Sequence, residues 1–275
     1  MPTHTVYFFL LPFIVSQALA IFLTAKLSGA EQLAVLGQQE FDWISIVISV
    51  ILFAALFFLF KRFFTKKAAF VFRILFIASI FFSFEIVFSA FALDPLLIFL
   101  SAGVIAAAYM LLSSILVHDV LILVSFSAIA SVMGMALVPM DVIFLLAALS
   151  LYDIIAVYKT RHMQEMARAF IGYRVIPAFI IPAAPAGFLK NRQEVVPSVG
   201  DYFIIGGGDV VLPTALTAAV FRFGTLHSVI VGAFVVVGAA VTYGLFRMGK
   251  RMPIPALPPL SLFGVLGYLL GSLFL

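Results

Sequence analysis

Two aspartates, Asp153 and Asp209, lie inside long apolar runs of the sequence, where a carboxylate is costly and usually serves a function. Two carboxyl groups that meet in a low dielectric cannot both ionise cheaply, so they would share a proton and titrate as a unit. One could then deprotonate water while the other protonates a carbonyl oxygen or a leaving nitrogen. The same pair could instead relay protons or cations, and on the aspartates alone a transporter is favoured over a hydrolase.

Glycines and prolines beside these aspartates indicate irregular backbone. Three glycines at 206–208 precede Asp209 and permit positive φ and a close approach by another backbone. Pro213 has no N–H for the Asp209 carbonyl, so a helix here is expected to bend. The four prolines within 253–259 favour an extended chain, which could pair with an unwound substrate strand.

The composition places this chemistry in a lipid bilayer. Of the 275 residues, 65% are hydrophobic and 10% are charged, against about half and a quarter in soluble domains. We therefore expect a multi-pass integral protein of the cell membrane with the bilayer as its main partner. The net charge of +4 resides in short loops beside apolar runs, which indicates membrane orientation and not nucleic-acid binding. The absence of cysteine excludes disulfides and thiolate chemistry, and neither a metal nor a cofactor is expected.

Apolar runs long enough to span the hydrocarbon, about 20 residues each, number nine. The expected fold is all-α, because a spanning segment in lipid must satisfy its own backbone hydrogen bonds. The two aspartates would lie about 6–11 Å from the same end of their spans, at about 1.5 Å per residue. The expected spans are 6–27, 43–60, 68–93, 95–117, 119–138, 140–157, 202–221, 225–247 and 255–275.

Lysine and arginine predict the orientation. The loops after the second, sixth and eighth expected spans hold 13 of the 16 basic residues. The excess of positive charge on the cytoplasmic side then places the N-terminus in the cytoplasm and the C-terminus outside. No lysine or arginine and only one histidine, His4, precedes the first apolar run, so we interpret that run as a retained helix and not as a cleaved signal peptide.

The expected organisation is one membrane domain interrupted by a loop. Residues 1–157 would hold the first six helices, 158–201 a proline-rich cytoplasmic loop, and 202–275 the last three helices. The apolar run 175–189 in this loop is too short to span and is broken by three prolines. It is either an apolar linker or a lid over a site near the cytoplasmic face, and we leave both interpretations open.

The other polar residues are interpreted without a catalytic role. The aspartates at span ends are expected to be interfacial: Asp94, Asp119, Asp141 and Asp201. Glu85 is interpreted as a polar contact between helices. The histidines are also expected at interfaces: His4, His118, His162 and His227. His162 and Glu165 form only half of a zinc-binding motif.

Three short motifs, taken together, resemble the presenilin and signal peptide peptidase family of intramembrane aspartyl proteases. They are Tyr152-Asp153 in the sixth expected span, Gly206-Gly207-Gly208-Asp209 in the seventh, and Pro255-Ala256-Leu257 in the ninth. They match the YD, GxGD and PAL motifs of that family in order and in span number. The resemblance covers almost the whole chain and is greatest to a microbial, archaeal presenilin homologue.

This resemblance implies a protease that hydrolyses transmembrane helices of single-pass proteins. Asp153 and Asp209 would be the catalytic pair. The other motif residues would shape the site or engage the substrate: Tyr152, Gly206, Gly207, Gly208, Pro255, Ala256 and Leu257. Presenilins usually have leucine where this chain has Gly207, which is expected to affect packing or substrate preference. Self-cleavage in the 158–201 loop and accessory subunits stay open. The alternative is a proton- or cation-coupled transporter or channel that uses the same aspartates.

Overall fold

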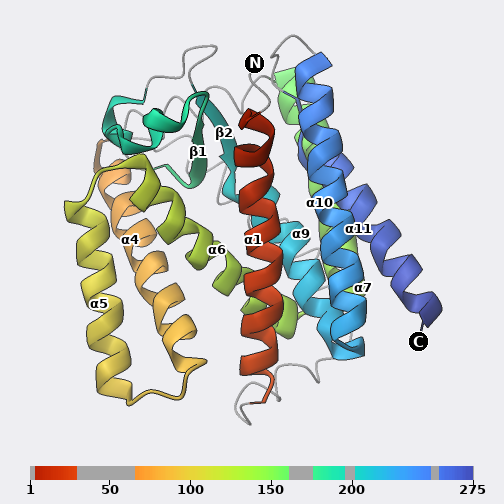
Figure 1. Ribbon diagram of the computed structural model, residues 1–275, viewed down its shortest axis with the longest axis horizontal. Coiled ribbons are helices and arrows are strands. Elements are labelled where there is room, and N and C mark those ends of the chain that lie inside the picture. Colours follow the sequence, from red (N-terminus) through yellow and green to blue (C-terminus); the bar gives the residue numbers. More distant parts are fainter. Residues whose placement is uncertain (1–3, 30–65, 161–175, 196–201, 249–253, 275) are drawn as a thin grey trace.

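The computed structural model describes residues 4–29, 66–160, 176–195, 202–248 and 254–274. Helices dominate this part of the chain, and two short strands lie at the end of the molecule where α1 begins (Figure 1). The α-helices are α1 (His4–Leu27), α4 (Lys66–Ser89), α5 (Pro95–Leu111), α6 (Ile115–Ala136), α7 (Pro139–Ile155), α9 (Gly207–Val220), α10 (Thr225–Met248) and α11 (Leu257–Gly271). The strands are β1 (Ala178–Pro182) and β2 (Tyr202–Gly206). Short 3-10 or π-helical turns are η2 (Ala156–Thr160), η3 (Pro185–Leu189), η4 (Arg192–Glu194), η5 (Phe221–Phe223) and η6 (Ser272–Phe274).

The expected count of nine transmembrane helices is wrong for the part of the chain that the structure describes. Six helices there are long and apolar enough to cross a membrane. They are Thr5–Leu27, Phe70–Ser89, Ile115–Ala136, Pro139–Tyr158, Thr225–Met248 and Leu257–Phe274. An odd number of spans, such as nine, requires the two ends of the chain to lie on opposite sides of the membrane. An even number, such as six, does not require this. The count therefore gives the predicted orientation no support.

The difference arises in three of the expected spans. The span expected at 43–60 lies outside the described residues. The span expected at 95–117 is divided between α5, which has only 17 residues, and the start of α6. The span expected at 202–221 is divided between β2 and the 14-residue α9. A run of apolar residues reports affinity for lipid but not which backbone hydrogen bonds it makes, so hydropathy merged separate elements.

The expected all-α fold also omitted a two-stranded antiparallel sheet. In its register Ala178 pairs with Gly206, Ile180 with Ile204, and Pro182 with Tyr202. Every residue of β1 is buried, so protein and not lipid surrounds its backbone. The run interpreted as a linker or a lid thus contributes a core strand at 178–182. Its isoleucines, together with the aromatic and branched residues of β2, were the sequence signal for strands.

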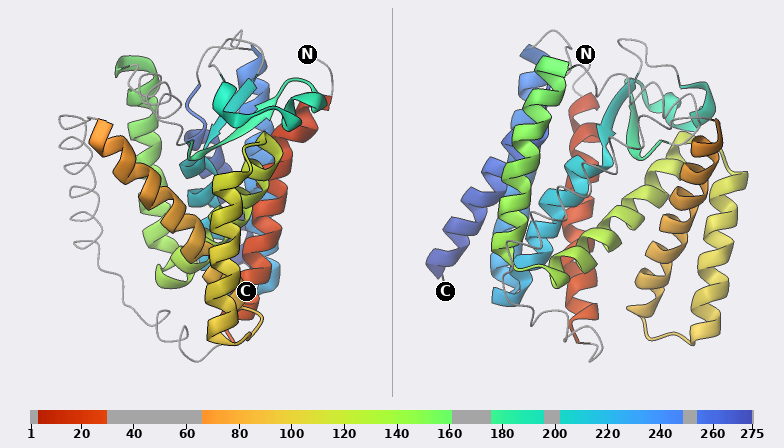
Figure 2. Two further views of the ribbon diagram at one scale, coloured as in Figure 1. Left: turned by 90° about the vertical axis from the view of Figure 1, so that its left-hand side faces the viewer. Right: turned by 180° about the vertical axis from the view of Figure 1, so that it is seen from behind.

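The core surrounds α9, which packs against α1, α6, α7, α10 and α11. Figure 2 shows α9 crossing the middle of the bundle between these helices. Polar side chains join it to its neighbours: Nε2 of Gln17 donates to Oγ1 of Thr214 at 2.7 Å, and Oγ of Ser228 donates to the Thr217 carbonyl at 2.8 Å. Such bonds between helices stabilise packing in lipid, where apolar burial alone gives little preference between neighbours.

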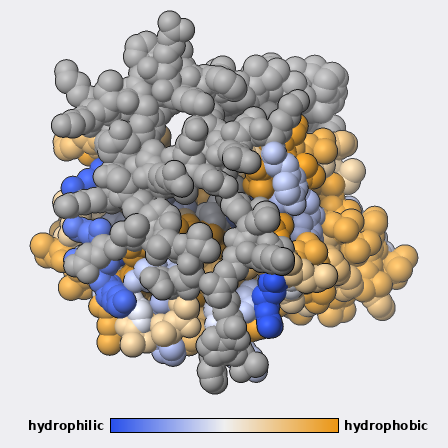
Figure 3. All heavy atoms as spheres, turned by 90° about the horizontal axis from the view of Figure 1, so that it is seen from above, coloured by the Kyte–Doolittle hydropathy of each residue, from blue (hydrophilic) through white to orange (hydrophobic). Residues whose placement is uncertain are grey.

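The flanks of the molecule are apolar. Large hydrophobic side chains such as Leu151 (65% exposed), Leu226 (64%) and Phe70 (65%) lie on the outer faces of their helices. Seen from the end where the strands lie, apolar side chains occupy the flanks of the bundle, most extensively on the right-hand side of Figure 3. Exposed apolar surface of this extent fits a bilayer as the surrounding solvent.

Candidate active site

Asp153 lies near the end of α7 and is held against the start of α11. Its Oδ2 accepts a hydrogen bond from the backbone N–H of Leu257 at 3.2 Å. Three residues earlier on α7, Oγ of Ser150 donates to Oγ of Ser261 at 2.9 Å. The later residue on α7 therefore contacts the earlier residue on α11, and the earlier residue on α7 contacts the later one. The two contacts define the register of an antiparallel pair of helices.

The Leu257 N–H is one of the donors that a helix leaves without an internal partner in its first turn. Ala256 is the N-cap of α11 and makes no side-chain cap, so the Asp153 carboxylate supplies the acceptor. The extended segment expected at 253–259 is shorter than predicted, because α11 already begins at Leu257. Pro258 and Pro259 fit its first turn, where the missing N–H groups have no intrahelical role. Residue 253 lies outside the described part of the chain.

Asp209 occupies the first turn of α9, directly after β2. Its carboxyl folds back over Gly206, so that a Cβ built on Gly206 would lie 3.1 Å from Oδ2 of Asp209. The two carboxyls lie near enough for their charges to interact, and α7 packs against α9. The structure therefore brings together the two aspartates that the sequence singled out, each half-buried, from helices that are separated in the chain by the two strands.

Gly207 has a packing partner that the sequence did not reveal. A Cβ at this position would lie 2.5 Å from Cζ of Phe126 and 2.9 Å from the Pro177 carbonyl oxygen. The Gly207 N–H donates to that same carbonyl at 3.0 Å. The ring of Phe126, from α6, thus occupies the space of a side chain at 207. At Gly208, in contrast, an added Cβ would meet no atom within 4 Å.

Tyr152, the other residue of its motif, lies on a different side of α7. Half of its surface is exposed (50%), whereas Asp153 is half-buried against α11. Neighbouring residues of a helix point in directions about 100° apart. The structure therefore does not enclose Tyr152 with the two carboxyls.

The remaining carboxylates of the described chain serve the backbone or lie apart. Asp94 caps α5, Asp141 accepts from the Val138 N–H at the start of α7, and Asp119 accepts from the Ile180 N–H. Glu85 is half-buried on α4, and Asp201 lies outside the described residues. Two histidines expected at interfaces are buried instead. His118 has no exposed surface and His227 has 3%, with its Nε2 bonded to the Tyr268 carbonyl.

His118 and Asp119 hold the outer edge of β1, which sequence analysis missed. The Ile180 N–H donates to Oδ1 of Asp119 at 3.0 Å, and the Ala178 carbonyl accepts from Nε2 of His118 at 3.1 Å. Both groups point away from β2, so α6 covers this edge. The signal was present as two adjacent polar residues within an apolar run, for which the sequence analysis predicted only an interfacial position.

The opposite edge of the sheet belongs to β2. In an antiparallel pair, partners whose backbone groups bond each other alternate with partners whose groups point outward. Ile180 points its N–H outward and pairs with Ile204, so the N–H and C=O of Ile204 also point outward, on the far side of β2. The described part of the chain places no strand there. This edge leads within five residues to Asp209, and Ile204 is 37% exposed.

Comparison with known proteins now identifies the family. The chain matches the family described as signal-peptide peptidase, presenilin aspartyl protease over residues 10–275. This chain belongs to that family. Its function is accordingly that of an intramembrane aspartyl protease, and the findings give no support to a transporter.

Two solved structures share the fold. Both are described as a presenilin family intramembrane aspartate protease, one in space group C222 and the other in P2. The first is 22% identical, with a TM-score of 0.67 over 98% of this chain and 99% of the other. The second is 23% identical, with a TM-score of 0.63 over 97% of each chain. No curated protein sequence matches the chain.

Membership of the family confirms the resemblance inferred from the three motifs, together with the location in the membrane. The family cleaves helical substrates within the membrane, so such helices are the substrates of this protein in general terms. Family membership does not assign roles to individual residues, nor does it say which kind of helix is cut or how that helix is held.

Proposed function

We propose that Asp153 and Asp209 are the catalytic pair of this protease and that they hydrolyse peptide bonds by activating water. The observation that supports this proposal is the meeting of the two helices that carry the carboxyls: α7 packs against α9, and Asp153 of α7 is bonded to the Leu257 N–H at the start of α11. General acid–base catalysis by two carboxyl groups requires that they share one substrate bond, and this meeting allows it.

In the proposed reaction, the ionised carboxyl of the pair takes a proton from water as the oxygen attacks the peptide carbonyl carbon. The protonated carboxyl donates its proton to the carbonyl oxygen, which gives a tetrahedral gem-diol. Collapse of the diol re-forms the C=O bond and breaks the C–N bond: the carboxyl that is now ionised takes the proton of a diol hydroxyl, and the protonated carboxyl donates its proton to the leaving nitrogen. One proton enters the pair and one leaves, so the pair returns to its singly protonated state.

We further propose that the open edge of β2 holds the substrate in an extended form. A transmembrane helix protects its peptide bonds by its internal hydrogen bonds, so it must unwind before water can attack. Ile204 presents an outward N–H and C=O to which an unwound strand can bond. Such a strand would run past Gly206 toward Asp209, with Pro255, Ala256 and Leu257 facing it from the start of α11 and the residues before it.

The proposed substrates are single-pass transmembrane proteins. The cleaved segment must leave its own bundle and lie beside β2, and a lone helix loses no helix–helix contacts when it does so. Accessory subunits are not required by this proposal.

The test uses purified full-length protein in detergent with a single-span helical peptide, and cleavage is followed by mass spectrometry. We expect Asp153→Asn and Asp209→Asn each to lower the cleavage rate by about a thousandfold or more, because each removes one half of the acid–base pair. Glu85→Gln is the matched control, since it also neutralises a carboxyl within a span and should cleave normally. Full activity in either asparagine variant would refute the assignment.

A further inference from the structure

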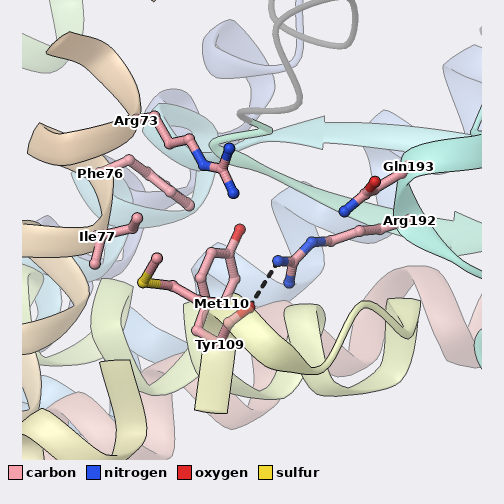
Figure 4. Close-up of a pocket in the computed structure, with 7 residues that line it drawn as sticks. All are labelled: Arg73, Phe76, Ile77, Tyr109, Met110, Arg192 and Gln193. Carbon is pink, nitrogen blue, oxygen red and sulfur yellow. Dashed lines mark hydrogen bonds between the residues drawn. The ribbon is translucent and has the colours of Figure 1, made fainter. Parts of the chain in front are cut away.

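A second polar site lies away from the aspartates, where α4 begins and α5 ends. Two arginines from separate elements, Arg73 on α4 and Arg192 on η4, line one pocket there (Figure 4). The guanidinium groups of both point into the space beside the Tyr109 hydroxyl. The pocket opens to solvent, and its enclosed part is small, about 10 Å³.

Arg192 is buried yet incompletely bonded. Its side chain is only 8% exposed, and its guanidinium carbon lies 3.9 Å from the centre of the Tyr109 ring. Nη2 donates to the Tyr109 carbonyl at 2.7 Å, whereas Nη1 is buried and has no hydrogen-bond partner among the described residues. Buried donors are almost always paired, so an unpaired nitrogen on a guanidinium group that lines a pocket indicates a missing acceptor.

Arg222 shows what a satisfied arginine looks like in the same protein. Its guanidinium donates to the backbone carbonyls of Ala219, Met135 and Leu137. These carbonyls belong to helix ends, where a cation is favoured. The guanidinium of Arg192 donates to only one backbone carbonyl, so Arg192, unlike Arg222, lacks an acceptor.

Among the described residues, the pocket has no negatively charged side chain. None of the side chains that line it is a carboxylate, and the second charge present is that of Arg73, which repels Arg192. Burial lowers the pKa of Arg192, and the like charge of Arg73 lowers it further. Two cations that face each other without a counter-charge are destabilising unless an anion joins them.

The donors present fit a phosphate group. Guanidinium groups bind phosphate through paired N–H donors, and two of them can neutralise its double or single negative charge. The amide of Gln193 lies at the same pocket and adds a neutral donor. The Tyr109 hydroxyl is already engaged: Nε2 of His118 donates to a carbonyl, so Nδ1 of His118 accepts from the hydroxyl at 3.1 Å.

Part of the pocket lining is apolar, with Phe76 and Met110 among its residues. It continues onto the exposed apolar faces of α4 and α5, where Met110 is 52% and Leu111 81% exposed. A phosphate that carries acyl chains could therefore place its charge between the arginines and its chains along these helices.

We propose that Arg73 and Arg192 form a binding site for a phosphate group, with the headgroup of an anionic phospholipid as the favoured source. This site is separate from the catalytic pair and does not depend on its assignment. It is linked to the sheet through Tyr109 and His118, which bonds to the Ala178 carbonyl of β1.

The test measures binding to the full-length protein in a neutral detergent by native mass spectrometry. The probes are phosphatidylglycerol, zwitterionic phosphatidylcholine and inorganic phosphate. We expect phosphatidylglycerol to bind about tenfold more tightly than phosphatidylcholine, and Arg73→Gln to remove that preference. Arg73 is exposed, so this variant should fold. Arg192→Lys should weaken binding as well, because lysine keeps the charge but loses the paired donors.

Arg247→Gln is the matched control, since it removes an equally exposed arginine from the end of α10 and should leave binding unchanged. Binding of inorganic phosphate that is lost in Arg73→Gln, without a preference for phosphatidylglycerol, would support the phosphate site and assign it to the free anion. Equal binding of both lipids and of phosphate by the wild type, Arg73→Gln and Arg247→Gln would overturn the proposal.

Discussion

The ring of Phe126 fills the space in which a side chain at Gly207 would lie. A Cβ on Gly207 would be 2.5 Å from Cζ and 2.7 Å from Cε2 of Phe126. Phe126 is itself packed edge-on against Phe179 of β1, with ring centroids 5.7 Å apart. The contact therefore joins α6, the sheet and the first turn of α9, immediately before Asp209.

This contact predicts that Gly207→Leu, which introduces the side chain usual in presenilins, destabilises the protein. Forcing extra atoms into a packed core costs about 1–3 kcal/mol. Thermal unfolding of the detergent-solubilised protein should show the lower midpoint. Gly208→Ala is the control, because its added Cβ would meet no atom within 4 Å and the substitution replaces a flexible glycine in the first turn of α9.

The same contact predicts a compensating pair. Phe126→Ala leaves a cavity and should cost about 3–5 kcal/mol alone. The double variant Phe126→Ala with Gly207→Leu should be more stable than the sum of the two single effects predicts, by about 1 kcal/mol or more. Additive effects in this double-mutant cycle would show that the ring and the glycine are independent.

The hydrogen bond from the Leu257 N–H to Asp153 predicts that substitutions of Asp153 can abolish catalysis without lowering the stability of the fold. Asparagine keeps an oxygen that can accept the Leu257 N–H, so Asp153→Asn should unfold near the wild-type temperature. Asp153→Ala removes the acceptor and should cost about 0.5–2 kcal/mol, as for other lost helix caps. Both variants should be inactive. If the two variants unfold at the same temperature, the carboxylate does not support the start of α11.

The open edge of β2 predicts a substrate effect at Ile204. Its N–H points away from β1, so Ile204→Pro removes a donor from that edge and leaves the pairing of β1 and β2 in place. We expect the specificity constant for a helical substrate to fall about tenfold, with a normal unfolding temperature. Ile204→Val, which keeps the N–H, should cleave like the wild type. Normal cleavage by the proline variant would place the substrate elsewhere.

A shared proton on Asp153 and Asp209 predicts a bell-shaped dependence of kcat/KM on pH. At low pH both carboxyls are protonated and no base is present, and at high pH both are ionised and no acid is present. The two apparent pKa values belong to the pair and not to either aspartate. The rate should be measured with one peptide across the full range in which the protein stays folded. A profile with only one limb would mean that a single group controls the rate.

The candidate site was accessible to sequence analysis because its residues carry unusual chemistry for their surroundings. A carboxylate in an apolar run is costly wherever the chain folds, so Asp153 and Asp209 could be recognised without coordinates. Asp119 also lies near an apolar run, yet it serves the backbone of β1. The free-energy cost of burying a carboxylate does not distinguish a catalytic carboxylate from one that accepts a backbone N–H, because burial imposes this cost on both.

What the sequence by itself determined is the membrane environment, the pair of aspartates and the three motifs, since these depend on residue type and local spacing. What only the tertiary structure decided is how the apolar runs divide into strand and helix. It also decided that Leu257 donates to Asp153 and that Phe126 occupies the place of a side chain at Gly207. The physical reason is that hydropathy describes a segment and its solvent, whereas hydrogen bonds and close packing join segments that are distant in the chain.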